Sequence, residues 1–297
     1  MEEDIFQLIA ADYTFKKIFA TSPNQQYIIR FLNLIVGKRV GKIKQIEYLS
    51  TEHYGIELYQ KKVVFDIMCR DEKQNNFIIE MQHTRHSKFV DRSITYLGRA
   101  ISSNTKKGSR SYDLVPIYVV CLLDFELPEF TEKGVCVQEV FLKNQENEIL
   151  TDKVGLFYVF LRNFACKQEG VPDELRLWMK LITQSNLMRE SDYAQMDNFF
   201  KGLLNECRIS KLNDMEKEEY RKSVLEYEDV QEAIANTKEW ATKEGYEEGY
   251  EKGIEKGIEK GRRSLLLTAK NFLAMGIPLQ DVLKATGLSE AEVRGER

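Results

Sequence analysis

The sequence predicts an α/β protein whose core has the element order α-β-β-β-α-β and whose C-terminal extension is mostly helical. Three observations lead to this fold class. Apolar residues alternate or cluster in four short segments between residues 43 and 125, as they do in strands. Helical patterns precede the first of these segments and separate the third from the fourth. After residue 126 the patterns are mostly helical.

The core elements follow one another along residues 12–125. A helical stretch from Asp12 ends in an apolar helix that Gly37 closes. The polar turn 71–76 separates two strands, which therefore form a hairpin. The last strand is apolar enough to be buried on both faces. We expect strands at 43–49, 61–69, 77–83 and 114–125, and a helix at 87–106.

We divide the chain into four parts. The core takes residues 1–130, a helical extension 131–240, a glycine-repeat helix 241–263 and a short helical tail 264–297. Within the extension we expect apolar helices at 154–164 and 174–182 and a long charged helix at 215–245. The tail resembles a helix-turn-helix with a capping box at Ser289 and Glu292, but its last helix is acidic. We interpret it as a packing or oligomerising element.

Composition restricts the class of protein. The 297 residues are 43% hydrophobic and 30% charged, which suits a soluble chain with a buried core. No apolar run is long enough to cross a bilayer, and the acidic N-terminus is unlike a secretory signal. The five cysteines form no close pairs, so we expect reduced thiols and a cytoplasmic protein. The net charge is −4, but residues 1–130 are weakly basic and are the better candidates to meet nucleic acid.

Two acids in the hairpin are candidates for a catalytic site. If the hairpin turns at residue 73, Asp66 lies opposite Glu80, and Gln82 shares their face of the sheet. Neighbouring carboxylates repel unless a cation lies between them. Mg²⁺ suits such a pair, and a water bound to it could hydrolyse a phosphodiester. The alternative is a half-exposed hairpin with its polar side in water, although apolar residues flank both acids and place them in the middle of their strands.

Several motifs together carry a family resemblance. They are DYTFKKIF, FLNLIV, VVFDIMCRD, FIIEMQ, FVDRSITYLGRA and the glycine-rich tail. In this order they resemble the recombination-promoting nucleases, also described as transposases, of the PD-(D/E)XK nuclease superfamily. The core resemblance covers about residues 12–125, and the tail is similar too. It implies a restriction-endonuclease-like core and a DNA endonuclease that depends on Mg²⁺ or Mn²⁺ and is associated with recombination or mobile elements.

The resemblance also implies roles for particular residues. Asp66 and Glu80 would be metal ligands. Gln82 takes the position where the wider superfamily has lysine, so we expect it to orient the water without contributing a charge. Asp12 would be a further metal ligand, or a simple helix N-cap.

The helix expected at 87–106 has a basic face. Its apolar side consists of Val90, Ile94, Leu97 and Ile101, and its basic side of Lys88, Arg92, Arg99 and Lys106. The apolar side can pack on the sheet, and the basic side can bind DNA phosphates. An ordinary solvated face is the alternative. Arg92 and Tyr96 also match an R-x-x-x-Y pattern of the family, so Arg92 is the strongest candidate.

The stretch EGYEEGYEKGIEKGIEKG places glycine at every fourth position. These are Gly245, Gly249, Gly253, Gly257 and Gly261. Each costs an isolated helix roughly 1 kcal/mol, and Glu and Lys form like-charge columns along it. Small residues at this spacing let a second backbone approach. We therefore predict a homo-oligomer through this helix, against the alternative of a repeat that frays in the monomer.

Two other functions remain open from the sequence. Because Gln82 replaces lysine, the core could be a degenerate nuclease that binds DNA or a protein without cutting it. The chain could also be an assembly protein that acts through its helical part. No membrane partner is expected.

Overall fold

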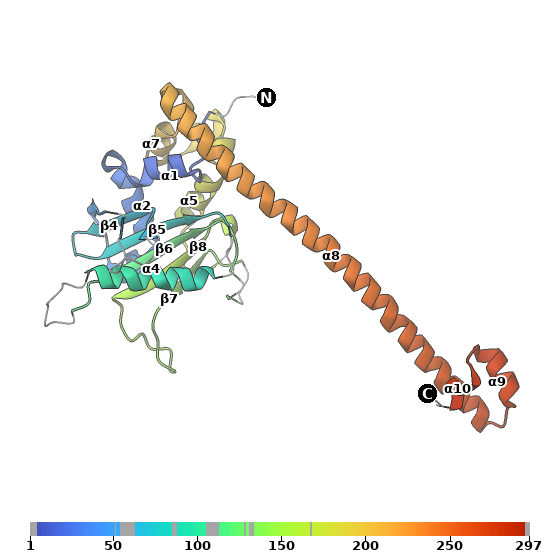
Figure 1. Ribbon diagram of the computed structural model, residues 1–297. Coiled ribbons are helices and arrows are strands. Elements are labelled where there is room, and N and C mark those ends of the chain that lie inside the picture. Colours follow the sequence, from blue (N-terminus) through green and yellow to red (C-terminus); the bar gives the residue numbers. More distant parts are fainter. Residues whose placement is uncertain are drawn as a thin grey trace. The chain divides into compact units, whose positions relative to one another are not determined.

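The computed structural model describes residues 5–50, 52–53, 63–84, 88–104, 113–127, 129–130, 134–166 and 168–294. The chain forms two compact units, residues 1–232 and 233–297. Helix α8 (Asp214–Ala274) begins in the first unit and continues into the second (Figure 1). Among the described helices, none is long and apolar enough to span a membrane.

The first unit is built on a mixed six-stranded sheet. Its strand order is β1-β4-β5-β6-β8-β7; β5, β6 and β8 run parallel, and the remaining neighbours are antiparallel. The strands are β1 (Ile46–Tyr48), β4 (Ile67–Asp71), β5 (Asn76–Gln82), β6 (Ile117–Leu123), β7 (Val137–Val140) and β8 (Val154–Phe160). Strands β2 (Glu52–His53) and β3 (Val63–Val64) form a separate antiparallel pair.

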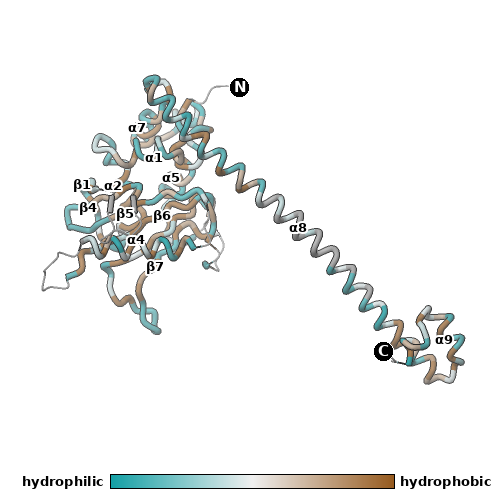
Figure 2. The backbone as a smooth tube through the Cα atoms, in the orientation of Figure 1, coloured by the Kyte–Doolittle hydropathy of each residue, from teal (hydrophilic) through white to brown (hydrophobic). Residues whose placement is uncertain are grey.

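Helices cover both faces of the sheet (Figure 1). One face packs against a layer of helices: α1 (Asp12–Phe19), α2 (Gln25–Ile35), α5 (Asp173–Gln184) and α7 (Asn198–Glu206). Trp178 of α5 lies at the centre of this layer, with Phe200 at 5.2 Å and Phe31 at 5.5 Å between ring centroids. The other face packs against α4 (Phe89–Asn104). Because both faces are covered, the central strands β6 and β8 carry no charged residue and are buried along their whole length. The brown colour of the central sheet in Figure 2 shows this apolar character.

Shorter helices complete the chain. They are α3 (Gly37–Val40), α6 (Glu190–Gln195), α9 (Leu279–Thr286) and α10 (Glu290–Arg294), with 3₁₀ turns at Ser22–Asn24, Leu161–Asn163, Ser185–Leu187 and Ile209–Lys211.

The hairpin register agrees with the sequence prediction. Ile67 pairs with Ile79 and Cys69 with Phe77, so the turn is centred on residue 73. The expected strands at 77–83 and 114–125 and the helix at 87–106 are also present as β5, β6 and α4. The expected strand 61–69 is instead broken at residues 65–66, between β3 and β4.

The expectation of a helix at 154–164 is wrong. These residues form β8 and then a 3₁₀ turn, and β8 pairs with β6 and β7 in the sheet. Every residue of β8 is buried. A strand buried on both faces has no alternation, so its periodicity does not distinguish it from a buried helix. The helices expected at 174–182 and 215–245 lie within α5 and α8.

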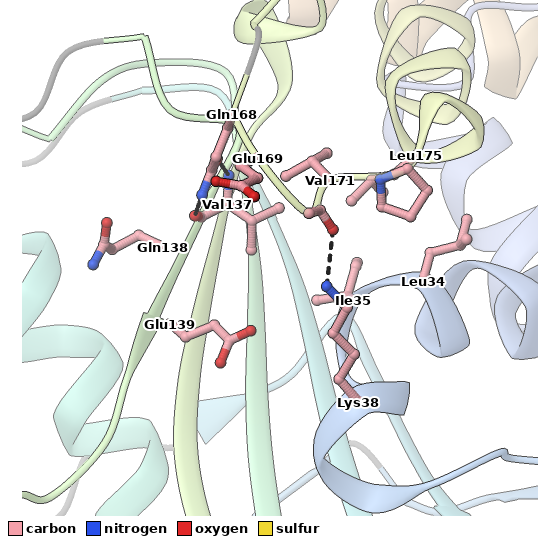
Figure 3. A pocket seen from close by; sticks show the side chains of 12 residues that line it. Leu34, Ile35, Lys38, Val137, Gln138, Glu139, Gln168, Glu169, Val171 and Leu175 are labelled. Atoms are coloured by element: carbon pink, nitrogen blue, oxygen red, sulfur yellow. Dashed lines mark hydrogen bonds between the residues drawn. The ribbon is translucent and has the colours of Figure 1, made fainter. Parts of the chain in front are cut away.

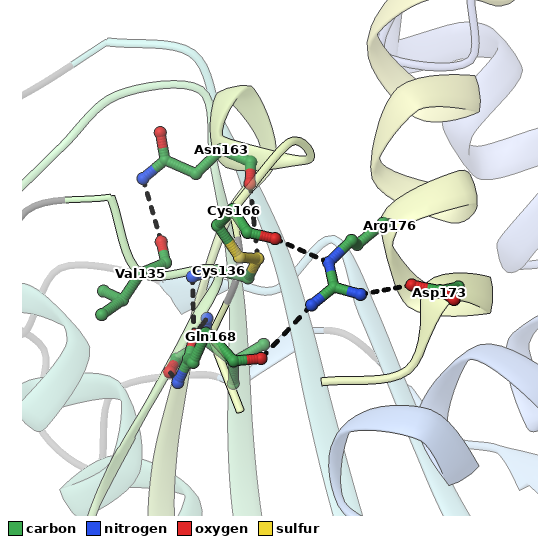
Figure 4. The surroundings of a disulfide bond; sticks show 8 residues. Val135, Cys136, Asn163, Cys166, Gln168, Asp173 and Arg176 are labelled. Carbon is green, nitrogen blue, oxygen red and sulfur yellow. Dashed lines mark hydrogen bonds and ion pairs between the residues drawn. A yellow bond between two sulfur atoms is a disulfide. The ribbon is translucent and has the colours of Figure 1, made fainter. Parts of the chain in front are cut away.

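The expectation that all the cysteines are reduced is also wrong. Cys136 and Cys166 form a disulfide, with their Cα atoms 6.0 Å apart (Figure 4). They are 30 residues apart in the sequence, but β7 and β8 are antiparallel neighbours, so the segment before β7 meets the segment after β8. Sequence spacing therefore gave no sign of the pair. Cys69, Cys121 and Cys207 are free and buried.

The second unit has a small core of its own. This core consists of Ala269 of α8, Val282 of α9, Val293 of α10, and Leu288 between α9 and α10. Gly287 ends α9 with a φ of 69°, a conformation that glycine adopts without strain. The expected capping box is present at the start of α10. Ser289 donates its backbone N–H to the Glu292 carboxylate at 2.9 Å.

Candidate active site

Strand β5 and the bend before β4 place two acids on the sheet face covered by α4. In β5, Ile78 packs on the α4 side, while Phe77 and Ile79 pack on the opposite side. Strand alternation therefore puts Glu80 and Gln82 on the α4 side. Asp66 precedes Ile67, whose partner is Ile79, so it lies opposite Glu80. Asp66 itself occupies the bend before β4, not the middle of a strand as expected.

Hydrogen bonds hold the two carboxyl groups together. The backbone N–H of Met81 donates to Asp66 Oδ2 at 2.8 Å, and the backbone N–H of Asp66 donates to Glu80 Oε1 at 3.2 Å. The Gln82 amide lies 3.4 Å from Glu80 Oε2. The break in the strand makes these two hydrogen bonds possible. It leaves the Asp66 N–H free to donate to Glu80 and lets the Asp66 carboxylate reach the backbone of β5.

The pair is electrostatically costly when it is ionised. Burial raises the pKa of Glu80 to about 8, and the charge of Asp66 adds to the effect. Burial also raises the pKa of Asp66. Glu80 is 2% exposed, so solvent does little to screen the repulsion. Without a cation, the site therefore favours retaining a proton.

Helix α1 packs on the face of the sheet opposite α4. Burial is the main cause of the raised pKa of Asp66; the charge of Asp12 adds to it, and the charge of Lys16 acts against it. Ala11 is the N-cap of α1 and Asp12 its first helical residue, so the alternative that Asp12 is the N-cap is wrong. The Asp12 carboxylate instead accepts from the Lys16 ammonium at 2.8 Å. Asp12 as a third metal ligand remains a prediction.

Helix α4 brings Arg92 to the acids. Its charge acts on both Asp66 and Glu80. Arg92 Nε donates to the Tyr96 hydroxyl at 2.7 Å, and the Tyr96 ring packs edge-on against Phe65 at 5.4 Å. Tyr96, which the sequence marked only as part of a pattern, therefore orients Arg92 beside the site.

The other basic candidates on α4 differ in position. Lys88 is exposed and Arg99 is half-buried, whereas Lys106 lies outside the described residues. The apolar face is displaced from the expected one, because Ile94 is 52% exposed and Phe89 and Ala100 are buried instead.

An ionic cluster at the end of β6 was not predicted. The Asp124 side chain is 1% exposed and accepts from Arg162 in a bidentate ion pair. Tyr227 and Gln231 of α8 also donate to Asp124, at 3.1 and 3.0 Å. The Asp124 backbone N–H donates to the Gln82 carbonyl at 2.9 Å. The cluster thus attaches the first part of α8 to the end of β5 that carries Gln82.

The donor set suits a hard cation. Asp66, Glu80 and Gln82 offer oxygen atoms, and Mg²⁺ is bound in many sites by one or two carboxylates with waters completing its shell. Within the described residues, no three His, Cys, Asp or Glu side chains are grouped to hold a metal ion. The two buried carboxylates fit a divalent cation that keeps several waters.

A separate pocket lies on the other side of the sheet (Figure 3). It has a volume of about 270 Å³, and Lys38 donates to the Gly170 carbonyl across it at 2.9 Å. Its lining includes none of the predicted site residues.

A mixed sheet flanked by helices, with one buried carboxylate on β5 and its partner in the bend before the neighbouring strand β4, defines the class as a PD-(D/E)XK-like nuclease core. A family model described as "PD-(D/E)XK nuclease family transposase" matches residues 9–237. The chain belongs to this family, which comprises nucleases linked to transposition, that is, hydrolases acting on DNA. PD-(D/E)XK nucleases generally use divalent metal ions. No curated protein and no solved structure matches the chain.

Proposed function

We propose that the protein is a Mg²⁺-dependent DNA endonuclease that hydrolyses phosphodiester bonds during recombination or the movement of mobile elements. The observation that carries this proposal is the pair formed by Asp66 and Glu80. Burial raises the pKa of both carboxyl groups, and the charge of Asp66 raises that of Glu80 further. Such shifts are typical of functional sites, here one arranged for a cation. Membership of a nuclease family supports the same function.

Each residue has a proposed role. Asp66 and Glu80 would hold the divalent cation, and Asp12 would join them as a third ligand from α1. The bound ion would balance their charges and favour attack of water on the phosphorus. Gln82 would orient that water through its amide. Arg92, held by Tyr96, would bind a phosphate oxygen of the DNA.

Further phosphate contacts would come from the same helix and the segment after it. We propose Lys88, Arg99 and Lys106 as backbone contacts that position the DNA without reading its sequence.

A cleavage assay tests the proposal. Purified protein should cut DNA with Mg²⁺ or Mn²⁺, and Asp66→Ala and Glu80→Ala should each lower the rate at least about 100-fold. Asp91→Ala removes an exposed acid of α4 and serves as the matched control, with a rate close to wild type. If the wild type cuts no DNA with either metal, or both variants cut normally, the proposal fails.

A degenerate nuclease that binds without cutting is the second candidate. The observation in its favour is Gln82, which contributes no positive charge where a lysine would. This candidate predicts salt-sensitive DNA binding that is indifferent to Mg²⁺ and unchanged in Asp66→Ala.

We also propose that the glycine repeat of α8 joins two copies of the chain. A β-carbon added at Gly253, Gly257 or Gly261 would meet nothing within 4 Å in the single chain, so space is open for a second backbone. Replacing these three glycines with leucine should lower the oligomeric mass measured by light scattering. An unchanged mass would contradict this contact surface.

A further inference from the structure

Three parallel strands end together at one edge of the sheet. Strands β5, β6 and β8 run side by side, and their last residues are in register, with Gln82 beside Leu123 and Leu123 beside Phe160 (Figure 1). Ligands of open α/β sheets bind outside the carboxyl ends of such strands. Because Gln82 belongs to the candidate active site, a charged group at the same edge is placed to contact the same substrate.

Asp124 and Arg162 lie just beyond the ends of β6 and β8. The backbone N–H of Asp124 donates to the Gln82 carbonyl at 2.9 Å, and Arg162 donates to both oxygens of the Asp124 carboxylate. Hydrogen bonds therefore link Arg162 to Gln82 through a single residue. The ends of β5 and β8 are two strand spacings apart, which is about 10 Å.

The Asp124 carboxylate is fully used by its donors. Its side chain is 1% exposed, and it accepts two hydrogen bonds from Arg162 and one each from Tyr227 and Gln231. A carboxylate has about four acceptor positions. Asp124 is thus a holder for the arginine and has no acceptor left for a metal ion or a substrate.

Helix α8 fixes the same arginine from a second direction. Arg162 Nη2 donates to the Gln231 side-chain oxygen at 2.9 Å and to the Tyr227 hydroxyl at 3.2 Å. The Tyr227 ring in turn packs edge-on against His83, with 4.9 Å between ring centroids. The guanidinium therefore has a set position before any ligand arrives, which lowers the entropy lost on binding.

Part of the guanidinium remains available to a ligand. Nε and Nη2 of Arg162 make the bonds described above, whereas no residue in the described part of the chain accepts a hydrogen bond from Nη1. The side chain is 50% exposed. A planar guanidinium that is held on one side presents its remaining N–H groups in a fixed direction, as phosphate recognition requires.

Arg39 provides a contrast on the same sheet. Its side chain is 40% exposed and forms an ion pair with Glu139 of β7 at 2.7 Å. Glu139 lies beside Phe157, before the end of β8, so Arg39 does not lie at the edge that carries Gln82. It has the same chemistry and a similar exposure in a different place.

We propose that Arg162 binds a phosphate of the DNA backbone beside the cleavage site, and that Asp124 is the positioning residue that directs its guanidinium. This inference rests on the proposed nuclease function. At roughly 3.4 Å per nucleotide, the separation of about 10 Å along the edge places this phosphate about three nucleotides from the one that is cut. Such a contact fixes the register of the DNA without reading its sequence.

The first test is a fluorescence anisotropy titration of duplex DNA at several salt concentrations, with Ca²⁺ in place of Mg²⁺. Arg162→Gln should weaken binding about tenfold and reduce the slope of log K against log salt by about 1. Arg162→Lys should keep the slope, and Arg39→Gln should follow the wild type. No DNA binding by the wild type, an unchanged slope in Arg162→Gln, or an equal change in Arg39→Gln overturns the proposal.

The second test separates a phosphate contact from a purely structural attachment of α8. Arg162→Gln leaves Asp124 buried without its cation, so the double variant Asp124→Asn/Arg162→Gln removes both charges and leaves the net charge unchanged. Circular dichroism checks its folding. It should show the same reduced slope, whereas Asp124→Asn alone should weaken binding by a smaller factor and keep the slope.

A wild-type slope in the folded double variant would mean that Arg162 only attaches α8, which overturns the proposal. The cleavage assay fails independently of this measurement. If the wild type binds DNA but does not cut it with Mg²⁺ or Mn²⁺, the proposed nuclease function is wrong, and the salt slopes still decide whether Arg162 binds a phosphate.

Discussion

Replacing Glu80 with glutamine should make the metal-free protein more stable at high pH. Glutamine has nearly the same shape but no charge, so it removes the repulsion with Asp66. The pKa of Glu80 is about 8 in the folded protein, against 4.5 for an unperturbed glutamate, first because of burial and then because of the charge of Asp66. The folded state therefore holds a proton that the unfolded state releases between these two pH values.

The sign and size of the effect follow from this difference. Because the folded state binds more protons, raising the pH from about 4.5 to about 8 favours unfolding. At 1.36 kcal/mol per pH unit, the full effect is about 5 kcal/mol. Glu80→Gln should thus match the wild type below pH 4.5 and exceed its free energy of unfolding by up to about 5 kcal/mol at pH 9.

Urea unfolding in EDTA at pH 4.5, 7 and 9 measures this difference. Glu146→Gln, a substitution in an exposed turn, controls for the loss of one negative charge and should follow the wild type at each pH. If Glu80→Gln and the wild type lose stability in parallel as the pH rises, the reasoning about the buried pair is refuted.

Three further predictions concern the cluster at Asp124, the helical layer and the DNA-binding face. Asp124→Ala should lower the free energy of unfolding at pH 7 by roughly 3 kcal/mol because Arg162 loses its buried partner. Since Arg162 and neighbouring groups outweigh burial and lower the pKa of Asp124, this difference should vanish as acid protonates Asp124; a constant difference would contradict it. Trp178→Ala should cost about 3–5 kcal/mol, whereas Trp240→Ala, at a residue 65% exposed, should cost under about 0.5 kcal/mol; equal costs in urea unfolding would argue against this core. Arg92→Ala should weaken DNA binding and reduce the slope of log K against log salt by about 1, and an unchanged slope in a fluorescence anisotropy titration would exclude a phosphate contact.

The hairpin was predictable because local patterns determine it. The polar turn fixed the register that puts Asp66 opposite Glu80, and the pairing of Ile67 with Ile79 confirms it. Alternation along β5 then placed Glu80 and Gln82 on one face. The break that turns Asp66 toward Met81 was not visible in a run rich in β-branched residues.

The missed features depend on contacts between distant segments. Strand β8 is buried on both faces and looks like a helix in sequence. Asp124 meets residues of α8 more than 100 positions away, and no sequence spacing signals that contact.

The central claim is that Asp66 and Glu80 form a site for a divalent cation. Calorimetric titration of Mg²⁺ or Mn²⁺ into the wild type and into Asp66→Ala tests it most directly. We expect saturable binding in the wild type and its loss in the variant, with Asp91→Ala binding normally. Equal binding in the wild type and Asp66→Ala, or no binding in either, would contradict the account.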